Sequence, residues 1–378
     1  MAILLAGDGF VTANVLRRAI EERSEASKKE RSEASKPEAA NEFAHHRIPA
    51  GIELNAIQSN WPNEPFHDYA GVREALGDED ELIAALSGAQ VCFSHTYPFS
   101  EKVIAASPEL QLITICRGGP VNVDLDAATR HGVIVSYTPG RNAVATAEHS
   151  VAMIMAAARQ IAQRDAELKA GQWRSDYYNY DAVGPEISGK TAGVCGYGAV
   201  GSRVARILQA MGADVVVYDP WIDAAKLEPG MELVPELDQL LERADILTLH
   251  SRLTAENQGM IGTEQIARLP QEAILVNCAR GGLLDYDAVA DALDSGHLYA
   301  AAFDCLPEEP LPAGHRLFNT PRVTMTPHLA GASKQAAELA ATIGARDIAA
   351  FLAGERPQFC ANPEVFESAA LRAHTPSE

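Results

Sequence analysis

The sequence predicts an α/β protein with two domains, each built on a parallel sheet flanked by helices. Short apolar runs alternate with amphipathic helical stretches along most of the 378 residues, which is the pattern of βαβ units rather than of hairpins. This length is sufficient for two domains with a core each. A glycine-rich turn at 196–201 directly follows one apolar run and opens a helix. We therefore expect two helix-flanked parallel sheets, with the second domain inserted into the first.

The first domain is expected to begin with a strand at 2–6 and an amphipathic helix at about 12–22. Further elements are expected as strands at 91–94, 110–116 and 133–135 and as a short helix at 124–131. Residues 23–28 and 31–36 repeat the sequence Arg-Ser-Glu-Ala-Ser-Lys. Because this repeat is charged and lacks an apolar stripe, we expect a solvated insertion rather than a docking arm.

A long helix is predicted at about 143–168, after the break at 138–140. Apolar residues lie on nearly every face of it over 147–161, which is typical of a helix buried between domains or subunits. The loop that follows contains Trp173, Tyr177, Tyr178 and Tyr180. These aromatic residues are interpreted either as a wall of an active site or as an arm that contacts a second subunit.

The next segment predicts a dinucleotide-binding βαβ unit. An apolar run at 191–195 leads to Gly196, Gly198 and Gly201, a helix at 202–211, a strand at 215–218 and then Asp219. The three glycines permit a tight turn, a close approach of pyrophosphate and tight helix–sheet packing. The helix N-terminus favours the negative charge of the pyrophosphate. Asp219 is suited to accept hydrogen bonds from the adenosine ribose and to repel a 2′-phosphate, so NAD is favoured over NADP.

Three side chains with catalytic chemistry follow later strands of this domain, namely Arg280, Glu309 and His328. The strands are expected at 246–250, 273–277, 300–303 and 323–326, and a final helix at 332–352 leads back to the first domain. An arginine can bind a carboxylate through two hydrogen bonds and polarise an adjacent carbonyl. A histidine paired with a carboxylate transfers protons near neutral pH. Together these residues predict a site that reduces or oxidises a small anionic molecule.

Amino-acid composition limits the classes of binding partner and the cellular location that we expect for the protein. The chain has 51 acidic and 31 basic residues and a formal net charge of −20, which disfavours nucleic acid and anionic membranes as partners. The six cysteines contain no Cys-x-x-Cys motif, and we expect buried thiols in a reducing cytoplasm. The histidines show no metal-ligand spacing, so no metal is expected. No signal peptide and no apolar run of membrane length is recognised. We therefore expect a cytoplasmic protein.

From about Leu110 to Gly331 the sequence resembles the D-isomer-specific 2-hydroxyacid dehydrogenase family, which includes phosphoglycerate, glycerate, D-lactate and hydroxypyruvate enzymes. The matching segments are 147–149, 193–201 with Asp219, 249–250, 253–254, 277–282, 303–310 and 326–328. The resemblance implies two Rossmann-like domains, a substrate-binding domain at 1–139 and 332–378 and an NAD-binding domain at 140–331. It also implies a homodimer and an NAD-dependent enzyme that interconverts a D-2-hydroxy acid and its 2-keto acid.

The resemblance further implies a role for individual residues. Arg280 binds the substrate carboxylate and carbonyl, His328 is the acid–base, and Glu309 is its carboxylate partner. Gly118 and Gly119 offer backbone N–H groups to the substrate. The residues expected to bind the cofactor are Gly196, Gly198, Ala199, Val200, Gly201, Asp219, Ser251, Cys278, Ala279, Arg280, Asp304, His328 and Gly331.

Two departures from the family pattern leave the substrate open. Ser251 and Arg252 follow His250 where a small residue and a proline are usual, and the loop at 117–124 is shorter than usual. We expect a small polar keto acid rather than 3-phosphohydroxypyruvate. Oxidation of phosphite stays an alternative, whereas formate enzymes carry a glutamine in place of Glu309. A co-repressor that senses NAD is a further alternative. Because the chain ends at residue 378, we expect no amino-acid feedback domain.

Overall fold

A computed structural model of the chain describes residues 1–24, 46–62, 67–69 and 71–372. It divides into two compact units: unit 1 contains Met1–Asn142 and Ser333–Glu378, and unit 2 contains Ala143–Ala332. The sequence places these divisions after residues 139 and 331. The structural boundaries differ slightly because helix α5 begins at Ala143 and Ser333 is the N-cap of helix α11.

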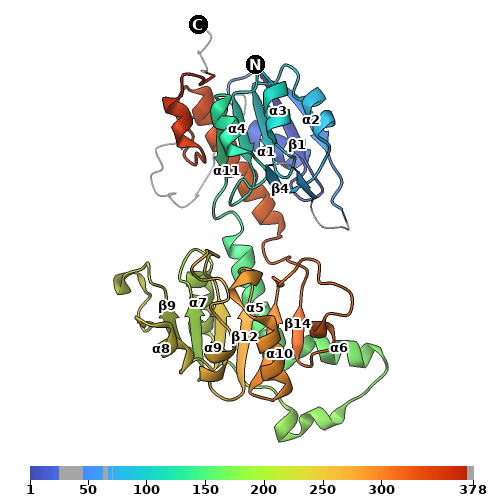
Figure 1. Cartoon of the computed structure of the whole chain (residues 1–378), viewed down its shortest axis with the longest axis vertical. Coiled ribbons are helices and arrows are strands. Elements are labelled where there is room, and N and C mark those ends of the chain that lie inside the picture. The colour runs from blue at the N-terminus through green and yellow to red at the C-terminus, as the bar shows by residue number, and fades with distance from the viewer. Residues whose placement is uncertain (25–45, 63–66, 70, 373–378) are drawn as a thin grey trace, which may run out of the picture. The chain divides into compact units, whose positions relative to one another are not determined.

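Unit 1 contains a five-stranded parallel sheet with the strand order β2-β1-β5-β6-β7 (Figure 1). The strands are β1 Ala2–Gly7, β2 Glu53–Gln58, β5 Val91–Ser94, β6 Leu112–Ile115 and β7 Ile134–Tyr137. A small antiparallel pair, β3 His67–Tyr69 and β4 Val72–Ala75, lies outside this sheet. The predicted strands of this domain are present in the sheet, and β2 is an additional strand at its edge.

Helices cover both faces of this sheet. They are α1 Ala13–Arg23, α2 Glu79–Ala85, α3 Glu101–Ala106, α4 Leu125–Arg130 and α11 Lys334–Leu352, and a 3₁₀ turn, η7, spans Pro363–Glu367. Alternate residues of β1 point to opposite faces: Ile3 packs with residues of α1 and α11, whereas Leu4 packs with residues of α2, α3 and α4. Burial on both faces explains why the inner strands β1, β5 and β6 are mostly apolar along their length.

Unit 2 contains a seven-stranded parallel sheet with the order β10-β9-β8-β11-β12-β13-β14 (Figure 1). The strands are β8 Thr191–Cys195, β9 Asp214–Tyr218, β10 Glu232–Leu233, β11 Ile246–Leu249, β12 Ala273–Asn277, β13 Leu298–Phe303 and β14 Val323–Met325. The predicted α/β class with parallel sheets flanked by helices is therefore confirmed.

Two helical layers cover this second sheet. Buried residues of α5 and α7 pack on one face, and buried residues of α8, α9 and α10 pack on the other. The helices are α5 Ala143–Arg159, α6 Ile161–Lys169, α7 Gly201–Ala210, α8 Leu237–Leu241, α9 Thr263–Arg268 and α10 Tyr286–Asp294. Short 3₁₀ turns are η2 Ser175–Tyr178, η3 Tyr180–Ala182, η4 Ala224–Lys226, η5 Gly281–Leu283 and η6 Arg316–Phe318.

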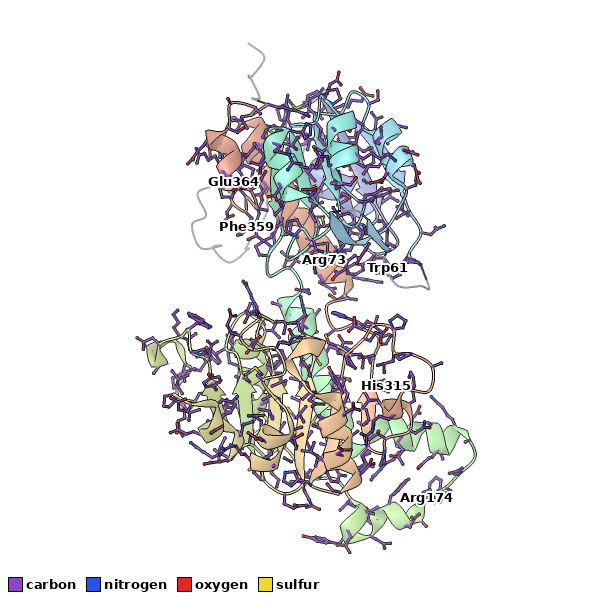
Figure 2. The ribbon with its side chains drawn as sticks, in the orientation of Figure 1. Trp61, Arg73, Arg174, His315, Phe359 and Glu364 are labelled. Carbon is purple, nitrogen blue, oxygen red and sulfur yellow. The ribbon has the colours of Figure 1, made fainter. Side chains whose placement is uncertain are left out.

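The prediction of a single long helix at 143–168 is wrong. Helix α5 ends at Arg159, Gln160 has a left-handed backbone with φ 49°, and α6 begins at Ile161. The break has a packing reason, because α5 buries residues such as Met153 and Ile154 while α6 buries none. After α6, the aromatic segment 173–180 extends from the body of unit 2, where Arg174 is labelled (Figure 2). Trp173, Tyr178 and Tyr180 are each more than four-fifths exposed there.

Three further expectations concern the rest of the chain. Apart from Arg23 and Ser24, the repeated segment 23–36 lies outside the described residues. All six cysteines are free thiols, and all except Cys360 are buried. Within the described ranges, no helix is long and apolar enough to cross a membrane.

Candidate active site

The glycine turn of unit 2 has the geometry of a phosphate-binding loop. Gly196 follows β8 with φ 95°, and a Cβ on Gly201 would lie 1.9 Å from the carbonyl oxygen of Gly196. Only glycine therefore fits at 201, where helix α7 begins. A Cβ on Gly198 would meet open space. Within the described residues the amides of Ala199 and Val200 donate no hydrogen bond, so the turn offers free donors to an anion at the helix N-terminus.

Asp219 lies at the carboxyl end of β9, the second strand of the βαβ segment that contains the glycine turn. Its Oδ2 accepts a hydrogen bond from the amide of Tyr197 at 2.8 Å, and its Oδ1 accepts one from the amide of Trp221 at 2.9 Å. These two bonds fix the carboxylate beside the glycine turn and leave each oxygen a further lone pair. A ribose diol is a ligand of the right chemistry for those lone pairs. The turn and Asp219 together fit an adenine dinucleotide.

Ser251 follows the neighbouring strand β11. Its hydroxyl donates to the carbonyl of Cys195 at 3.3 Å, and a Cβ on Gly196 would lie 2.8 Å from the Ser251 amide. Ser251 is thus in direct contact with the glycine turn, as expected for a residue beside the cofactor. Arg252 is exposed.

The turn after β12 carries Cys278, Ala279 and Arg280. The buried amide side chain of Asn277 shapes it, because Asn277 accepts from the Ala279 amide at 3.0 Å and donates to the Arg280 carbonyl at 2.9 Å. Cys278 is buried, whereas Arg280 is exposed. Arg280 donates through Nη1 to the carbonyl of Ala279 at 2.7 Å. With one neutral partner among the described residues, most donors of Arg280 are available to a carboxylate.

The structure brings His328 and Glu309 together. His328 Nδ1 lies 2.7 Å from Glu309 Oε2, and Glu309 Oε1 accepts from the Leu306 amide at 2.9 Å. The ring is therefore held at one nitrogen, and His328 has a left-handed backbone with φ 52°. The side chain of His328 is 48% exposed. It can exchange a proton at Nε2 while Glu309 holds Nδ1.

Electrostatics favour the charged form of this pair. Hydrogen bonds of His328 with Cys305 and with Glu309 raise the pKa of His328 above its ordinary value, against the opposing effect of burial. Burial acts to raise the pKa of Glu309, but the hydrogen bonds with His328 and the Leu306 amide, together with the nearby charges of His328 and Arg280, outweigh it, and the pKa of Glu309 is lowered. An imidazolium beside a carboxylate is the form that donates a proton.

Asp304 holds the loop that carries His328. Its buried carboxylate accepts hydrogen bonds from the Thr326 hydroxyl at 2.6 Å and from the amides of Leu329 and Ala330 at 2.7 and 2.8 Å. His149 of α5 reaches the same group, with Nε2 3.4 Å from Asp304 Oδ1. Gly331, which is partly exposed, ends this loop. The contacts position His328, and the expected binding of the cofactor by Asp304 stays a prediction.

Cys305, which the sequence predicts only as a buried thiol, lies beside the His328 ring. Its Sγ lies 3.7 Å from His328 Nε2 and donates to the Ala279 carbonyl at 3.3 Å. One donor atom each from Cys305, Glu309 and His328 lie within 4.8 Å of one another, a grouping that could hold a metal ion. The short spacing Cys305-x-x-x-Glu309 is the signal that could have suggested this cluster.

Unit 1 places Gly118 and Gly119 at the carboxyl end of β6. Neither amide donates a hydrogen bond within the described part of the chain, and a Cβ on either residue would meet open space. Arg117, which precedes these glycines, is in an ion pair with Glu74 and also donates to the Glu74 carbonyl at 2.9 Å. Its charge is therefore largely offset.

Comparisons with known proteins agree with this arrangement. Residues 151–330 match the model of the D-isomer specific 2-hydroxyacid dehydrogenase NAD binding domain. The chain is 34% identical over 311 residues to a glyoxylate reductase of Thermofilum pendens, covering 82% of this chain and 87% of that protein. A D-3-phosphoglycerate dehydrogenase of Mycobacterium tuberculosis is 40% identical over 291 residues, covering 76% of this chain and 54% of the relative. The chain thus spans about half the length of that relative.

Solved structures agree in fold. The crystal structure of D-lactate dehydrogenase with NAD⁺ from Lactobacillus jensenii superposes with a TM-score of 0.70 at 26% identity, covering 96% of this chain and 99% of that one. The TT0316 protein from Thermus thermophilus gives a TM-score of 0.73, also at 26% identity, over 96% of this chain and 100% of that one. The chain therefore belongs to the D-isomer specific 2-hydroxyacid dehydrogenase family, with an NAD-binding domain at residues 151–330.

Proposed function

We propose that the protein is an NAD-dependent oxidoreductase that interconverts a D-2-hydroxy acid and its 2-keto acid. The observation that carries this proposal is the 2.7 Å hydrogen bond between His328 Nδ1 and Glu309 Oε2. Glu309 follows β13 and His328 follows β14, the two strands that succeed β12 in the sheet order. NAD supplies the hydride acceptor in oxidation, and its reduced form supplies the hydride donor in reduction. Family membership and the glycine turn support the cofactor.

Each residue has a defined part in this proposal. Arg280 binds the substrate carboxylate and polarises the carbonyl. His328 donates a proton from Nε2 to the carbonyl oxygen in reduction and accepts the hydroxyl proton in oxidation. Glu309 holds the ring and stabilises the imidazolium. Gly118 and Gly119 add backbone donors for the acid.

The test is to mix the protein with NADH and each of a panel of 2-keto acids, and to measure NADH oxidation from the loss of NADH absorbance. We expect glyoxylate and hydroxypyruvate to be reduced with a higher kcat/KM than 3-phosphohydroxypyruvate. Proline at 120 has no N–H donor, and Arg117 is already paired with Glu74, so a phosphate would lack cationic partners in this loop. A kcat/KM about tenfold higher for the phosphorylated acid would contradict this assignment. No turnover of any acid would favour a protein that only senses NAD.

Exchange of Asp219 should change cofactor choice. We expect the unmodified protein to have a kcat/KM for NADH well above that for NADPH, and Asp219→Ser to reduce this ratio mainly through KM. The reason is that the carboxylate binds the ribose diol and repels a 2′-phosphate. Asp223→Ser is the matched control, because Asp223 is an exposed carboxylate that also accepts from a backbone amide. An equal preference for both cofactors before mutation would show the assignment to be wrong.

Exchange of Glu309 should move the pH dependence of reduction. Reduction needs protonated His328, so its rate falls as the pH rises through the pKa of His328. Glu309 helps to raise that pKa, and Glu309→Gln should therefore shift the alkaline limb of kcat/KM to lower pH. The neighbouring Glu308 is exposed, and Glu308→Gln should leave the limb in place. If the alkaline limbs of both variants coincide with that of the parent, Glu309 does not control the pKa of the proton donor.

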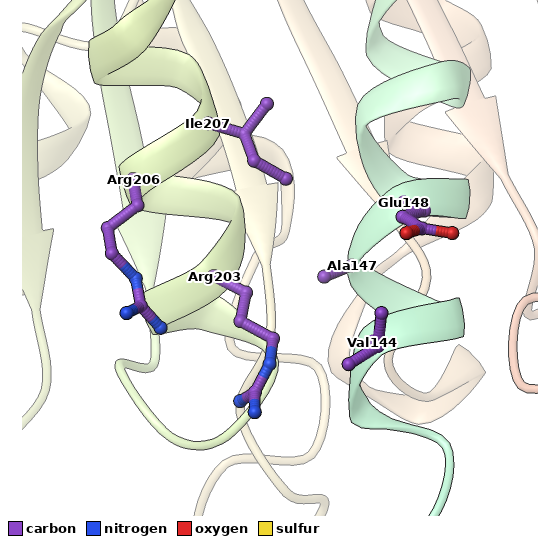
Figure 3. Close-up of a pocket in the computed structure, with 6 residues that line it drawn as sticks. All are labelled: Val144, Ala147, Glu148, Arg203, Arg206 and Ile207. Atoms are coloured by element: carbon purple, nitrogen blue, oxygen red, sulfur yellow. The ribbon is translucent and has the colours of Figure 1, made fainter. Parts of the chain in front are cut away.

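We also propose that the protein is a homodimer. The support is exposed apolar and aromatic surface on unit 2: Val144 of α5 and Ile161 and Leu168 of α6 are about half exposed, and Trp173, Tyr178 and Tyr180 are almost fully exposed. Figure 3 shows Val144 and Ala147 of α5 facing α7, where a cavity of about 190 Å³ is lined by Ile207 and Arg203. Exposed apolar patches of this kind are typical of subunit contacts. Sedimentation equilibrium of the full chain tests this, and a monomer at micromolar concentration would refute it.

A further inference from the structure

Cys305, Glu309 and His328 form a cluster of three different metal-ligating side chains, all within unit 2. Cys305 and Glu309 follow β13, and His328 follows β14, the neighbouring strand of the sheet. One donor atom of each residue lies within 4.8 Å of the other two. Among the described residues, no other three histidine, cysteine or acidic side chains are grouped in this way. The expectation of no metal depends on histidine spacing, which a cluster of one histidine, one thiol and one carboxylate does not show.

The separation of the thiol and the imidazole fits a tetrahedral zinc ion. Cys305 Sγ lies 3.7 Å from His328 Nε2. Zinc binds a thiolate sulfur at about 2.3 Å and an imidazole nitrogen at about 2.0 Å, so a tetrahedral angle places these two ligand atoms about 3.5 Å apart. An ion between Sγ and Nε2 therefore requires very little movement of either side chain.

Glu309 is placed to supply a third ligand. Its Oε2 lies 2.7 Å from Nδ1 of the same imidazole, and its Oε1 accepts from the Leu306 amide at 2.9 Å. Oxygen and nitrogen ligands of tetrahedral zinc lie about 3.3 Å apart, so the carboxylate has to shift toward Nε2 by about 1.5 Å. The thiolate and the carboxylate then carry two negative charges that balance the charge of the ion.

An ion can reach the cluster from the solvent on the imidazole side. The side chains of His328 and Glu309 are 48% and 38% exposed, whereas Cys305 is buried and closes the inner side. A thiolate with an imidazole selects zinc over magnesium and calcium, which prefer oxygen ligands. The positive charge of Arg280 also acts on Glu309 and opposes a bound cation. We therefore expect binding that a chelator reverses.

We propose that Cys305, Glu309 and His328 bind Zn²⁺, and that the bound ion reversibly inhibits the protein. The ion occupies Nε2 of His328, which is the nitrogen that donates the proton in the proposed reaction. The metal-free protein is then the active form, and zinc is an inhibitor rather than a cofactor. Zinc binding stands on the cluster alone, whereas its inhibitory effect rests on the proposed function.

Cobalt gives a direct measurement of ligation that needs no turnover. The full chain is first freed of metal with a chelator and then titrated with Co²⁺. A bond between Co²⁺ and a thiolate gives an intense charge-transfer band in the near ultraviolet, and tetrahedral coordination gives strong visible bands. We expect both sets of bands to saturate, and added Zn²⁺ to remove them. Absence of the thiolate band at saturating Co²⁺ would overturn the site.

Variants identify the ligands. Cys305→Ser keeps a donor for the Ala279 carbonyl but removes the thiolate, so it should abolish the charge-transfer band. It should also raise the Kd for Zn²⁺ about 10²-fold or more, because loss of even an outer-shell partner typically costs about 10- to 100-fold in metal affinity. Cys305→Ala repeats the test without a hydroxyl group, and melting temperatures verify that both variants fold. His328→Asn should weaken Zn²⁺ binding to a similar extent.

Cys360→Ser is the matched control. Cys360 is the one cysteine that is only partly buried, so it is the thiol at which non-specific metal binding is expected. Its replacement should leave the charge-transfer band and the Kd for Zn²⁺ unchanged. A band that persists in Cys305→Ser and disappears in Cys360→Ser would overturn the assignment.

A kinetic arm tests the inhibition, with each protein compared with its own metal-free rate. At about ten times its Kd, Zn²⁺ should leave about a tenth of the parental rate of keto acid reduction, by mass action, and a chelator should restore the rest. The same concentration should leave most of the rate of Cys305→Ser. Full parental turnover at a saturating concentration of Zn²⁺ would refute the inhibitory role. If the parent reduces no keto acid while the thiolate band still forms, the proposed function fails and the metal site stands.

Discussion

Replacement of His328 by asparagine is expected to lower kcat for keto acid reduction by about 10²-fold or more, the usual cost of losing general acid catalysis. Asparagine keeps a polar side chain of similar reach but cannot deliver a proton near neutral pH. Because the glycine turn and Asp219 are untouched, NADH should still bind the variant. Both quantities are measured by steady-state kinetics and by NADH fluorescence titration.

His315→Asn is the matched control. His315 is a partly buried histidine in the connection between β13 and β14, and its Nδ1 accepts a hydrogen bond from the Leu317 amide at 3.3 Å. It should retain nearly the parental kcat. A kcat in His328→Asn within a few-fold of the parent, with NADH still bound, would remove His328 from the proton transfer.

Replacement of Arg280 by glutamine is expected to lower kcat/KM by about 10²-fold or more. Hydrogen bonds that involve charged groups are each worth about 1.5–3 kcal/mol, and a guanidinium makes two of them to a carboxylate. The loss should be smaller in Arg280→Lys, which keeps the charge but not the planar pair of donors. In the part of the chain that the structure describes, the side chain of Arg280 hydrogen-bonds only to the Ala279 carbonyl, so the variant should fold with a melting temperature near that of the parent.

Arg268→Gln controls for the change in charge. Arg268 forms exposed ion pairs with Asp238 and Glu242, and such pairs contribute little to stability. Its loss should leave kcat/KM unchanged. If both arginine variants behave alike, carboxylate binding does not depend on Arg280.

Much of the fold follows from local sequence. The apolar runs at 191–195 and 273–277 coincide with β8 and β12, because a strand buried on both faces must be apolar throughout. The need for glycine at 196 and 201 is also predictable from local sequence. Gly196 has φ 95°, and a Cβ on Gly201 would lie 1.9 Å from the Gly196 carbonyl oxygen, so both positions disfavour a side chain. The order of strand, turn, helix and acid then specifies a dinucleotide unit without reference to any distant residue.

The break between α5 and α6 at Gln160 could not be predicted from local sequence. Residues on both sides of Gln160 have good helical propensity, and propensity is a weak guide where tertiary packing decides. Helix α5 has a sheet face to cover and α6 has none. The difference lies in the surroundings of the two segments and not in their composition.

What the sequence by itself determined is the set of elements, the phosphate turn and the chemical kinds of the candidate catalytic residues. Only the tertiary structure decided which of these side chains meet. Cys305 lies at the free nitrogen of His328 because β13 and β14 are neighbours in the sheet. Asp8, His95 and Arg141 are brought together by the strand order of unit 1. Strand order depends on how whole faces pack against helices, and short apolar runs of similar composition do not encode it.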